Sequence, residues 1–511
     1  MAHFIIAPKQ NTPANNLKSI SGKISEFWSK KTNGNKQSVI HIEADPQAVE
    51  QHKSELSGTH HIEAVIPHTN GQKELLQNMA EEHLKRSKEN SPVVQHATIA
   101  APVPSPAPVM VVVDGIAENT PPVPLYGSTV SAVIVEAGHL PDTVTAITNQ
   151  NGQVSFTLDN SGMSIGMIMT DPAGNYWSMA TSSNETSYQI DCPLIANDGP
   201  YGWWQQLMGL SSYDATRGKG MKVGVIDTGV GPNPCLQNVI DLGSLINGVY
   251  DPTGGGDVDI HGSIVCGLIA AQPQQNGQYG GTASGATIFS IRVFPSDGGD
   301  ANQGDVAQAI RMMVDEHQVD LINLSLASKI PSKIEEEAIN YAYNKGVVCV
   351  CASGNTGTPV SYPAAYPEAI SVGALGLNTW GPAGSVTQVL IPTDPTRINP
   401  AGYYIPMFSN FGSKLDCVAP AVGLISTFPD KYGINQAYGD LAGTSLASPM
   451  VVGFLCGQLA IDEQYQKLTG AARAAYVKPA LVAACTSLGL PAELQGAGVP
   501  KIENTSINPL P

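Results

Sequence analysis

The feature that most constrains the fold is an alternation of apolar, strand-like runs with helix-like stretches over residues 200–511. The apolar runs are Lys222–Ile226, Thr287–Val293, Leu321–Ser325, Val347–Ala352 and Ile370–Ala374. The helix-like stretches are Gly262–Ala271, Asp305–Glu316 and Ser332–Lys345. A strand that is apolar along its whole length needs cover on both faces, so this alternation predicts an α/β fold with a doubly wound parallel sheet. In such a sheet, ligands bind beyond the carboxyl ends of the strands.

Charge is distributed unevenly along the chain, and its distribution marks two further regions ahead of the sheet. The 511 residues carry a net charge of −17. Residues 111–199 contain no Lys or Arg, whereas residues 1–110 are nearly neutral and hold eight of the eleven histidines. An acidic chain without basic clusters is not expected to bind nucleic acid or an anionic membrane surface. No apolar run approaches the roughly 20 residues that a membrane-spanning helix needs.

The two regions ahead of the sheet have different strand and helix patterns. Residues 1–90 contain strand-like segments at 3–7, 38–43 and 61–67 and helix-like segments at 24–31, 45–56 and 72–88, which predict an α+β domain. Residues 91–108 are rich in Pro and Ala and predict an extended linker. Residues 109–192 show short alternating stretches at roughly ten-residue spacing, typical of a small antiparallel, Ig-like β-sandwich. The α/β domain then spans residues 197–505.

Two features bear on the compartment in which the chain works. The first residues lack the cationic lead and apolar stretch of a Sec signal. Most of the eight cysteines stand singly inside apolar runs, where a free thiol behaves as a small hydrophobic residue. Together these features favour the reducing cytoplasm, with export by a route that needs no leader left open.

Two candidate catalytic residues lie at the ends of predicted elements. Asp227 directly follows the strand-like run Lys222–Ile226, where it either orients an imidazole or caps a turn. His261 precedes the helix-like stretch that starts at Gly262, and a histidine at a helix start is often only structural. Residues 200–511 contain one other histidine, His317, on a polar helix face. If this domain uses an imidazole base, His261 is therefore the leading candidate.

Two more candidates complete the set. Ser445 lies in Gly-Thr-Ser-Leu-Ala-Ser-Pro-Met at the start of an apolar helix, where free N–H groups favour a negative charge. It is either a nucleophile whose own N–H faces an oxyanion or a helix N-cap. Asn355, in Ser-Gly-Asn-Thr-Gly, follows another strand-like run, and its amide either donates to the same oxyanion or forms a turn.

Taken together and in this order, these motifs resemble those of the subtilisin-like serine protease (subtilase) family over about residues 200–505. The matching motifs are Val-Ile-Asp-Thr-Gly around Asp227, His-Gly-Ser-Ile-Val-Cys-Gly from His261, Ser-Gly-Asn at Asn355 and Gly-Thr-Ser-Leu-Ala-Ser-Pro around Ser445. The order Asp…His…Ser is the one known for subtilisin. The resemblance implies a serine endopeptidase in which Ser445 is the nucleophile, His261 the general base and Asp227 the residue that orients it. Asn355 and the N–H of Ser445 would form the oxyanion hole.

The resemblance also implies how a polypeptide substrate would bind. The substrate would add as an extended strand along Leu324, Ser325, Leu326 and Ala327 and along the segment after Val293. Cys351, Ala352, Ser353 and Ser361 would line the primary specificity pocket. Because these residues are small and uncharged, we expect a roomy pocket that takes large apolar side chains.

The sequence departs from the family pattern at several places. Ser263-Ile264-Val265 replaces the usual Thr-His-Val, and Met450 stands where the family commonly has His. Residues 376–405 form an insertion that is a lid, an exosite or, most simply, a surface loop. No cofactor is expected. Calcium is known in the family, but Cys235 and the amide-rich stretch Gln274–Tyr279 replace the usual ligands, so no metal site is assigned.

The N-terminal region resembles the strand–helix–strand half of a subtilase propeptide, on the segments around residues 38–53 and 61–66. The resemblance implies a ferredoxin-like, inhibitory domain that the enzyme itself removes, and thus a zymogen. Its many histidines either make its release pH-dependent, since imidazoles gain charge near pH 6.5, or belong to a segment that is simply solvated. Two rivals stay open: an inactive subtilase used as a peptide-binding scaffold, and a ligase or macrocyclase that uses the same residues.

Overall fold

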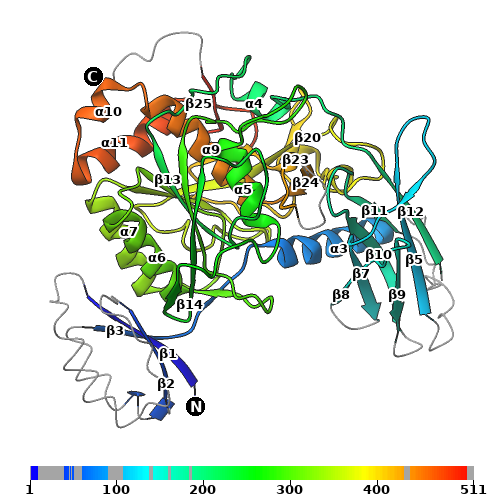
Figure 1. Ribbon diagram of the computed structural model, residues 1–511, viewed down its shortest axis with the longest axis horizontal. Coiled ribbons are helices and arrows are strands. Elements are labelled where there is room, and N and C mark those ends of the chain that lie inside the picture. Colours follow the sequence, from blue (N-terminus) through cyan, green and yellow to red (C-terminus); the bar gives the residue numbers. More distant parts are fainter. Residues whose placement is uncertain are drawn as a thin grey trace.

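The computed structural model describes residues 2–9, 39–44, 46–47, 49–50, 60–89, 108–136, 142–158, 163–182, 187–430 and 438–502 (Figure 1). The helix predicted at residues 24–31, most of the one predicted at 45–56 and nearly all of the linker lie outside these ranges. Among the residues described, no helix is long and apolar enough to cross a membrane.

A nine-stranded sheet forms the centre of the molecule. Its strands are β13 (Lys222–Asp227), β14 (Val239–Ile246), β15 (Val249–Asp251), β16 (Thr287–Arg292), β18 (Leu321–Leu324), β19 (Val348–Ala352), β20 (Ile370–Leu377), β21 (Tyr403–Tyr404) and β22 (Cys417–Pro420). Their order is β15-β14-β16-β13-β18-β19-β20-β21, with β22 also beside β20. The strands from β14 to β20 and β22 pair in parallel, whereas β15 and β21 are antiparallel edges. The predicted α/β sheet is confirmed, and it is mixed.

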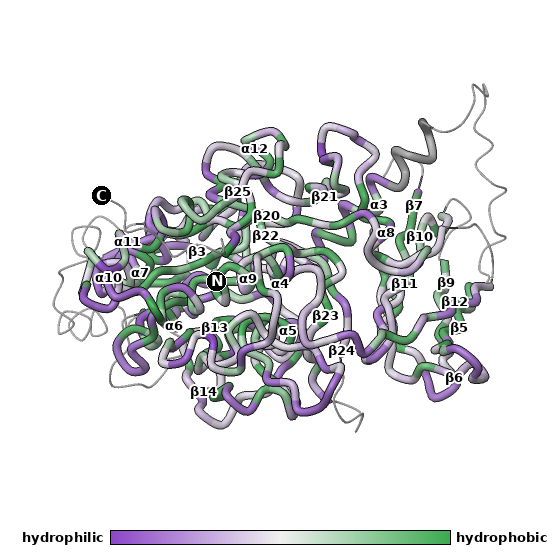
Figure 2. The backbone as a smooth tube through the Cα atoms, turned by 90° about the horizontal axis from the view of Figure 1, so that it is seen from above, coloured by the Kyte–Doolittle hydropathy of each residue, from purple (hydrophilic) through white to green (hydrophobic). Residues whose placement is uncertain are grey.

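Helices pack on this sheet in two pairs. One pair is α5 (His261–Ala270) with α9 (Thr444–Leu459), and the other is α6 (Gln303–Asp315) with α7 (Lys333–Asn344). Every residue of α5 is buried, as are nearly all of α9, so both helices are apolar all round rather than amphipathic. Figure 2 shows the same apolar character in the central strands. The residues that begin α5 and α9 are thereby held in a rigid interior.

The N-terminal strands form a separate, smaller sheet beside α6 and α7 (Figure 1). β1 (Ala2–Pro8) lies between β2 (Ile40–Ala44) and β3 (His60–Ala64), antiparallel to both. The side chain of Ile5 closes on Gly304 of α6, where an added Cβ would lie 2.9 Å from Ile5 Cδ1. Apolar contact therefore joins this sheet to the larger domain.

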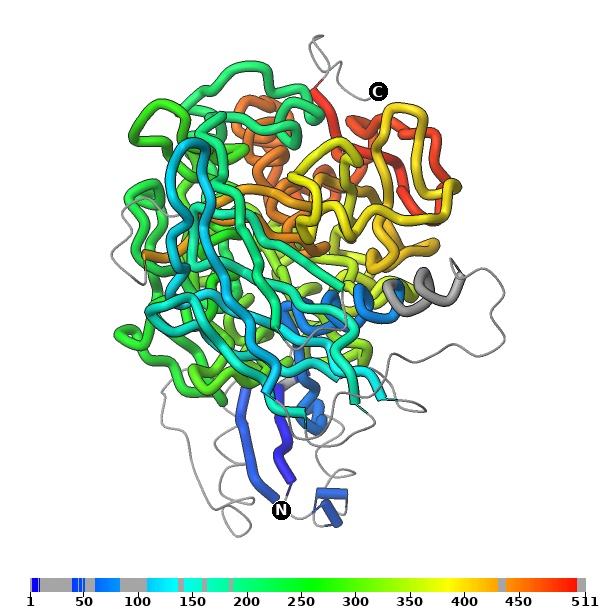
Figure 3. The backbone as a smooth tube through the Cα atoms, turned by 90° about the vertical axis from the view of Figure 1, so that its right-hand side faces the viewer, coloured from blue at the N-terminus to red at the C-terminus, as the bar shows by residue number. Residues whose placement is uncertain are grey.

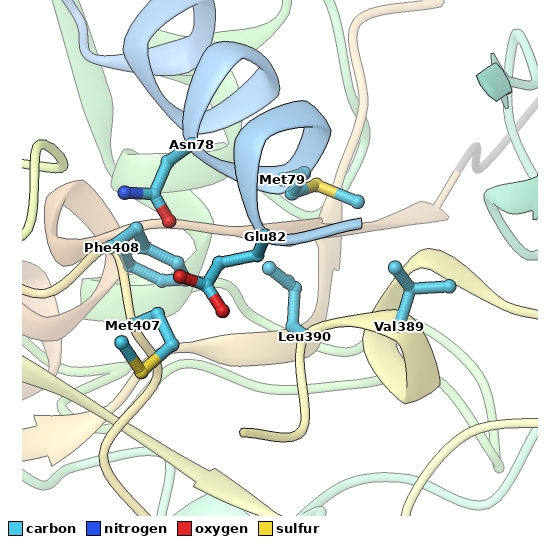
Figure 4. A pocket seen from close by; sticks show the side chains of 7 residues that line it. All are labelled: Asn78, Met79, Glu82, Val389, Leu390, Met407 and Phe408. Carbon is cyan, nitrogen blue, oxygen red and sulfur yellow. The ribbon is translucent and has the colours of Figure 1, made fainter. Parts of the chain in front are cut away.

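Helix α3 (Gln72–Glu89) follows the short strand β4 (Pro67–His68) and leaves the central domain in the direction of a second module (Figure 1). The sequence predicted a mostly solvated helix here. In the structure, Leu75, Met79 and Ala80 are buried, because this face packs on the insertion and on strands of the second module. Figure 4 shows Asn78, Met79 and Glu82 of α3 lining a small crevice against Leu390 and Phe408.

The second module consists of two sheets with one shared core, drawn in cyan and teal in Figure 3. One sheet contains β7 (Thr129–Glu136), β8 (Asp142–Ile147), β10 (Met163–Asp171) and β11 (Met179–Thr181); the other contains β5 (Pro108–Ile116), β6 (Val123–Pro124), β9 (Gln153–Thr157) and β12 (Ser187–Pro193). β12 pairs with β5 in parallel, so the fully antiparallel arrangement expected from the sequence is wrong at this pair. The chain reaches β12 by a long path through the opposite sheet, and such a crossover permits parallel pairing.

The insertion at residues 376–405 is where this module docks. The Ala180 N–H donates to the Gly384 carbonyl (2.9 Å) and the Val386 N–H to the Ser178 carbonyl (2.9 Å). The rings of Trp177 and Trp380 meet edge to face with centroids 5.5 Å apart. The insertion therefore serves as an anchor for the second module, which the sequence did not predict.

Two carboxyls, the buried Asp440 and the half-buried Asp171, lie near one another at this junction. The Ser178 N–H donates to Asp440 Oδ1 (2.7 Å) in the strand β24 (Tyr438–Ala442), which leads toward Ser445. Burial and the nearby Asp171 raise the pKa of Asp440 to about 7, and burial raises the pKa of Asp171 to about 6. Ionisation of both carboxyls is unfavourable here, because the two negative charges would repel each other in a site with little water.

Asp440→Asn is expected to stabilise the protein at alkaline pH and to change little at pH 4. A raised pKa means that the unfolded chain releases the proton first, so stability falls as pH rises from about 4 to 7. Asn keeps the Oδ1 acceptor for Ser178 and cannot ionise, so the gain at pH 8 is at most about 4 kcal/mol. Thermal unfolding in a Ser445→Ala background, which prevents self-digestion, measures it. The exposed Asp142→Asn serves as control, and an equal shift at pH 4 and 8 would contradict the explanation.

Candidate active site

Asp227 and His261 meet at the carboxyl end of the sheet. Asp227 is the last residue of β13 and His261 the first of α5, and both are fully buried. His261 Nδ1 lies 2.8 Å from Asp227 Oδ1, which also accepts the Thr228 N–H at 2.7 Å. This contact leaves Nε2 as the free nitrogen of the ring. A proton on Nδ1, held by the carboxylate, makes Nε2 the basic nitrogen.

A polar network that the sequence did not single out fixes the start of α5. Asp257 Oδ2 accepts from the N–H (2.9 Å) and the hydroxyl (2.6 Å) of Ser263, and its Oδ1 accepts from the Thr228 hydroxyl (2.7 Å). Thr228 Oγ1 in turn accepts the Gly262 N–H at 2.8 Å. Asp257 thus supplies the helix cap that Ile260 cannot. The only signal in the sequence was an acidic residue four positions before His261.

Ser445 lies in the first turn of α9. Its Oγ is buried and, among the residues that the structure describes, has no hydrogen-bond partner; the same holds for His261 Nε2. Ser325 Oγ donates to the Ser445 carbonyl (2.6 Å) and fixes this turn against β18. Gly443, just before the helix, has φ +142°, and a Cβ there would lie 3.1 Å from Ser445 Oγ. The glycine keeps the space beside the hydroxyl open.

Asn355 is oriented from both ends. Its Oδ1 accepts from the N–H (2.9 Å) and the hydroxyl (2.7 Å) of Thr444, the residue before Ser445. Its Nδ2 is thereby directed away and donates to the carbonyl of Gly71 at 3.0 Å. An amide that is held by its own oxygen is a preorganised donor, which is what an oxyanion site requires. Thr444 is a second contributor that sequence reasoning did not name.

The surroundings of His261 favour its protonated form more than bulk water would. Burial alone would lower the pKa of His261, but the Asp227 carboxylate raises it by charge and by hydrogen bonding. The net result is a pKa above the ordinary value of 6.5. The imidazole is therefore a stronger base than a free histidine, yet it is neutral at alkaline pH and able to accept a proton there.

The chain's own segment 66–72 passes through this site. The Ile66 N–H donates to Gln303 Oε1 (2.7 Å), and β4 pairs antiparallel with β17 (Ala301–Asn302). Thr69 and Ala327 exchange two backbone hydrogen bonds of 3.0 and 2.9 Å. Past Gly71, the Gln72 side chain donates to the Ala442 carbonyl at 3.3 Å. The segment therefore lies as an added strand between β17 and Ala327. Its Gly71 carbonyl accepts the hydrogen bond from Asn355 Nδ2.

The expected substrate-binding residues divide into those that reach this segment and those that do not. Ala327 pairs with it directly. Leu324 is internal to the sheet, between Ile226 and Cys351, and Leu326 is buried. Ser325 contacts Ser445 instead, as described above. The backbone of Leu324 already pairs with strands on both sides. Only the residues beyond the end of β18 can therefore pair with another chain.

The four residues expected to wall the primary pocket are all buried. Cys351 and Ala352 end β19, while Ser353 and Ser361 are both tied to Asn410, by hydrogen bonds of 3.3 and 3.0 Å. The residue of segment 66–72 that carries its carbonyl to Asn355 is Gly71, which has no side chain. The preference for large apolar residues stays a prediction.

Cys235 and the stretch Gln274–Tyr279 stand where the family usually has calcium ligands. No group of three or more His, Cys, Asp or Glu side chains that would hold a metal ion occurs in the described part of the chain. In the stretch Gln274–Tyr279, Gln278 Oε1 already accepts the N–H groups of Gln274 (2.6 Å) and Gln275 (2.9 Å). Cys235 Sγ lies 3.2 Å from the Tyr438 hydroxyl. These donors and acceptors satisfy one another and do not fit a calcium ion.

Comparison with known proteins decides the family. A family model described as "Subtilase family" matches residues 218–498, which is more than half of the chain. The chain belongs to the subtilase family. It is a serine-type endopeptidase, a hydrolase that acts on polypeptides. The matched range contains Asp227, His261, Asn355 and Ser445.

Two relatives illustrate the similarity. The subtilase is 35% identical to Subtilisin BL of Lederbergia lenta over 237 residues, which are 46% of this chain and 75% of that protein. It is 34% identical to the Major intracellular serine protease of Bacillus subtilis (strain 168) over 265 residues, which are 49% of this chain and 70% of that protein.

Proposed function

We propose that this subtilase hydrolyses peptide bonds through an acyl-enzyme on Ser445, with His261 as general base and Asp227 as the residue that fixes its tautomer. Ser445 Oγ attacks the carbonyl carbon, its proton passes to His261 Nε2, and the C–N bond breaks as that proton moves to the leaving amine. Water then repeats the sequence and releases the acid. Asn355 Nδ2 stabilises the oxyanion in both steps. The 2.8 Å contact of His261 with Asp227, and the Nε2 atom that it leaves without a hydrogen-bond partner among the described residues, support these roles.

We further propose that the protein is made as a zymogen and that Gly71–Gln72 is the bond it cuts in itself. The single observation that carries this proposal is the hydrogen bond from Asn355 Nδ2 to the Gly71 carbonyl (3.0 Å). A carbonyl that accepts from the expected oxyanion donor, in a segment that pairs with Ala327, supports its assignment as the scissile carbonyl; the same carbonyl also accepts the Leu75 N–H at 3.0 Å. Residues 1–71 would then be the propeptide, with a ferredoxin-like fold, and would block the cleft until cleaved. The boundary at residue 90 expected from the sequence gives way to one at residue 71.

Three histidines of the proposed propeptide contact carboxylates of the catalytic domain, and we propose that they contribute to its binding in addition to apolar contact and strand pairing. His41 pairs with Asp305 (3.2 Å), His61 with Glu337 (2.7 Å) and His68 with Glu335 (2.8 Å). Burial alone lowers the pKa of His68, but Glu335 raises it further, so its pKa lies above 6.5. The His68 contact therefore stabilises the complex below pH 6.5 and is lost as pH rises through the raised pKa. Alkaline conditions, not acid, would favour release.

The two-sheet module is proposed to be a β-sandwich domain that stays with the mature enzyme. Its contacts with the insertion, and those of α3 at the crevice, involve no residue of the segment 1–71. Loss of that segment would leave them intact. A reducing compartment is proposed from the eight cysteines, all of which are free thiols.

Self-cleavage of the wild-type precursor is expected to produce a new N-terminus at Gln72. Gly71→Ala is expected to slow it about tenfold or more, because the added Cβ would lie 2.4 Å from Asn355 Nδ2 and Gly71 has φ +78°. Intact mass and N-terminal sequencing over time measure both. The control is Gly220→Ala, which has a similar φ of +90° and no atom within 4 Å of the added Cβ. A first cleavage at another bond, or normal cleavage of Gly71→Ala, would reject this site.

A further inference from the structure

We propose that Glu335 makes this subtilase select a cationic side chain four residues before the cleaved bond. The preferred substrates would carry Lys, Arg or protonated His at that position. The inference rests on the proposed function, because it takes segment 68–71 to lie where a substrate lies. Counting back from the Gly71–Gln72 bond, Gly71 is the first residue, and His68 is the fourth.

The fourth residue is held in one place by backbone pairing on both sides. His68 pairs with Ala301 of β17, and its neighbour Thr69 pairs with Ala327. Any extended chain with the same pairing places its fourth side chain where the His68 side chain now lies. That side chain is wholly buried. The environment of His68 is therefore the environment that a substrate side chain would meet.

That environment is acidic. His68 Nε2 lies 2.8 Å from Glu335 Oε1, and both side chains have an exposed fraction of 0%. Asp300, just before β17, adds a second negative charge that raises the pKa of His68. Within the described ranges, Glu335 has no other ion pair. Nearby Glu337, which pairs with His61, is partly exposed, and such a pair is worth little.

Glu335 occupies a helix position that suits an acidic side chain. It lies in the first turn of α7, where its N–H donates to the N-cap Ser332 (3.1 Å) and where the helix dipole favours a negative charge. A buried carboxylate without a partner is costly. An aliphatic fourth residue would enclose the carboxylate with the Tyr366 hydroxyl beside it but with no cationic partner, whereas a cationic residue would replace His68. Selection therefore works mainly by rejecting the wrong side chain.

Internally quenched peptides with the sequence of residues 66–75 test the inference when only position 68 varies. Lys and Met are a matched pair there, since they are similar in length and differ in charge. With the mature enzyme, kcat/KM is expected to be about 10–100-fold higher for Lys than for Met, the range for a hydrogen bond between charged groups. Glu335→Gln is expected to bring the two rates within about threefold of each other, and Glu335→Leu to favour Met. Glu336→Gln, a surface variant on the same helix, is expected to keep the parent preference.

Equal rates for Lys and Met in the parent enzyme would overturn the inference, as would an unchanged preference in both Glu335 variants. Labelling by a fluorophosphonate probe, which reacts with an activated serine, shows that each variant is folded and active. If the parent enzyme is labelled but does not distinguish the peptides, only the inference fails. If it is neither labelled nor able to cleave any peptide, the proposed function fails first.

Discussion

Ser445→Ala is expected to abolish peptide hydrolysis, with a loss on the order of 10⁶ in kcat. The alanine has no oxygen to attack the carbonyl, so neither the acyl-enzyme nor self-cleavage forms, and the Gly71–Gln72 bond stays intact. The variant chain should therefore keep its full mass, while the parent chain loses residues 1–71. Because Ser445 Oγ has no hydrogen-bond partner in the described part of the chain, its removal leaves no buried donor unsatisfied. Folding should be unchanged.

Two comparisons make the Ser445 result decisive. A fluorophosphonate probe should label the mature parent enzyme. It should not label Ser445→Ala after added parent enzyme has cleaved off the propeptide of this variant. Ser211→Ala, an exposed serine in a loop, should be labelled, cleave itself and hydrolyse peptides as the parent does. Equal labelling of Ser445→Ala, or no labelling of the parent, would favour the inactive scaffold. Mass spectrometry of the products separates hydrolysis from ligation, since ligation would give joined or cyclic peptides.

Asp227→Asn is expected to lower kcat/KM by about 10⁴-fold and to shift its pH dependence. The amide can donate to Nδ1, which favours the tautomer with its proton on Nε2, the wrong nitrogen to accept the Ser445 proton. In the parent, activity should rise with pH through a midpoint above 6.5, because the base must be neutral and Asp227 raises its pKa. Without that carboxylate, burial dominates, so the midpoint should move to lower pH.

Rates with a fluorogenic peptide between pH 5 and 10 measure both effects, after removal of the propeptide by parent enzyme. Asp142→Asn, an exposed residue of strand β8, is the matched control and should show parent rates at every pH. A profile of Asp227→Asn with an unchanged midpoint would contradict the proposed role of Asp227. A midpoint that moves upward would contradict the electrostatic explanation as well.

The central sheet could be predicted from the sequence because its strands are apolar on both faces. Five runs predicted as strands became β13, β16, β18, β19 and β20 within a few residues. Asp227 and His261 were likewise placed at element ends that a parallel sheet brings to one edge. Periodicity did not reveal β14 and β22, because β14 carries exposed and polar positions and β22 ends in a proline, which is rare inside strands.

Other features depended on contacts between distant segments. The insertion at residues 376–405 has no helix or strand period, and its role as an anchor follows from pairing with residues 178–180. Gly71 has no local signal for a cleavage site. It acquires one only because Thr69 pairs with Ala327, 258 positions away along the chain, and places the next residues on Asn355.

By itself, the sequence determined the α/β sheet, the family and the four residues on which the chemistry is proposed to depend. These are local properties: apolar periodicity, and short motifs whose residue types suit one reaction. Only the tertiary structure decided which peptide carbonyl of the chain lies at Asn355. It also decided that a glutamate contacts the side chain of His68, three positions before Gly71. Glu335 carries no local signal in the sequence, and only the fold buries it against His68. Burial removes water from a charge, and it is this loss of screening that turns an ordinary glutamate into a determinant of specificity.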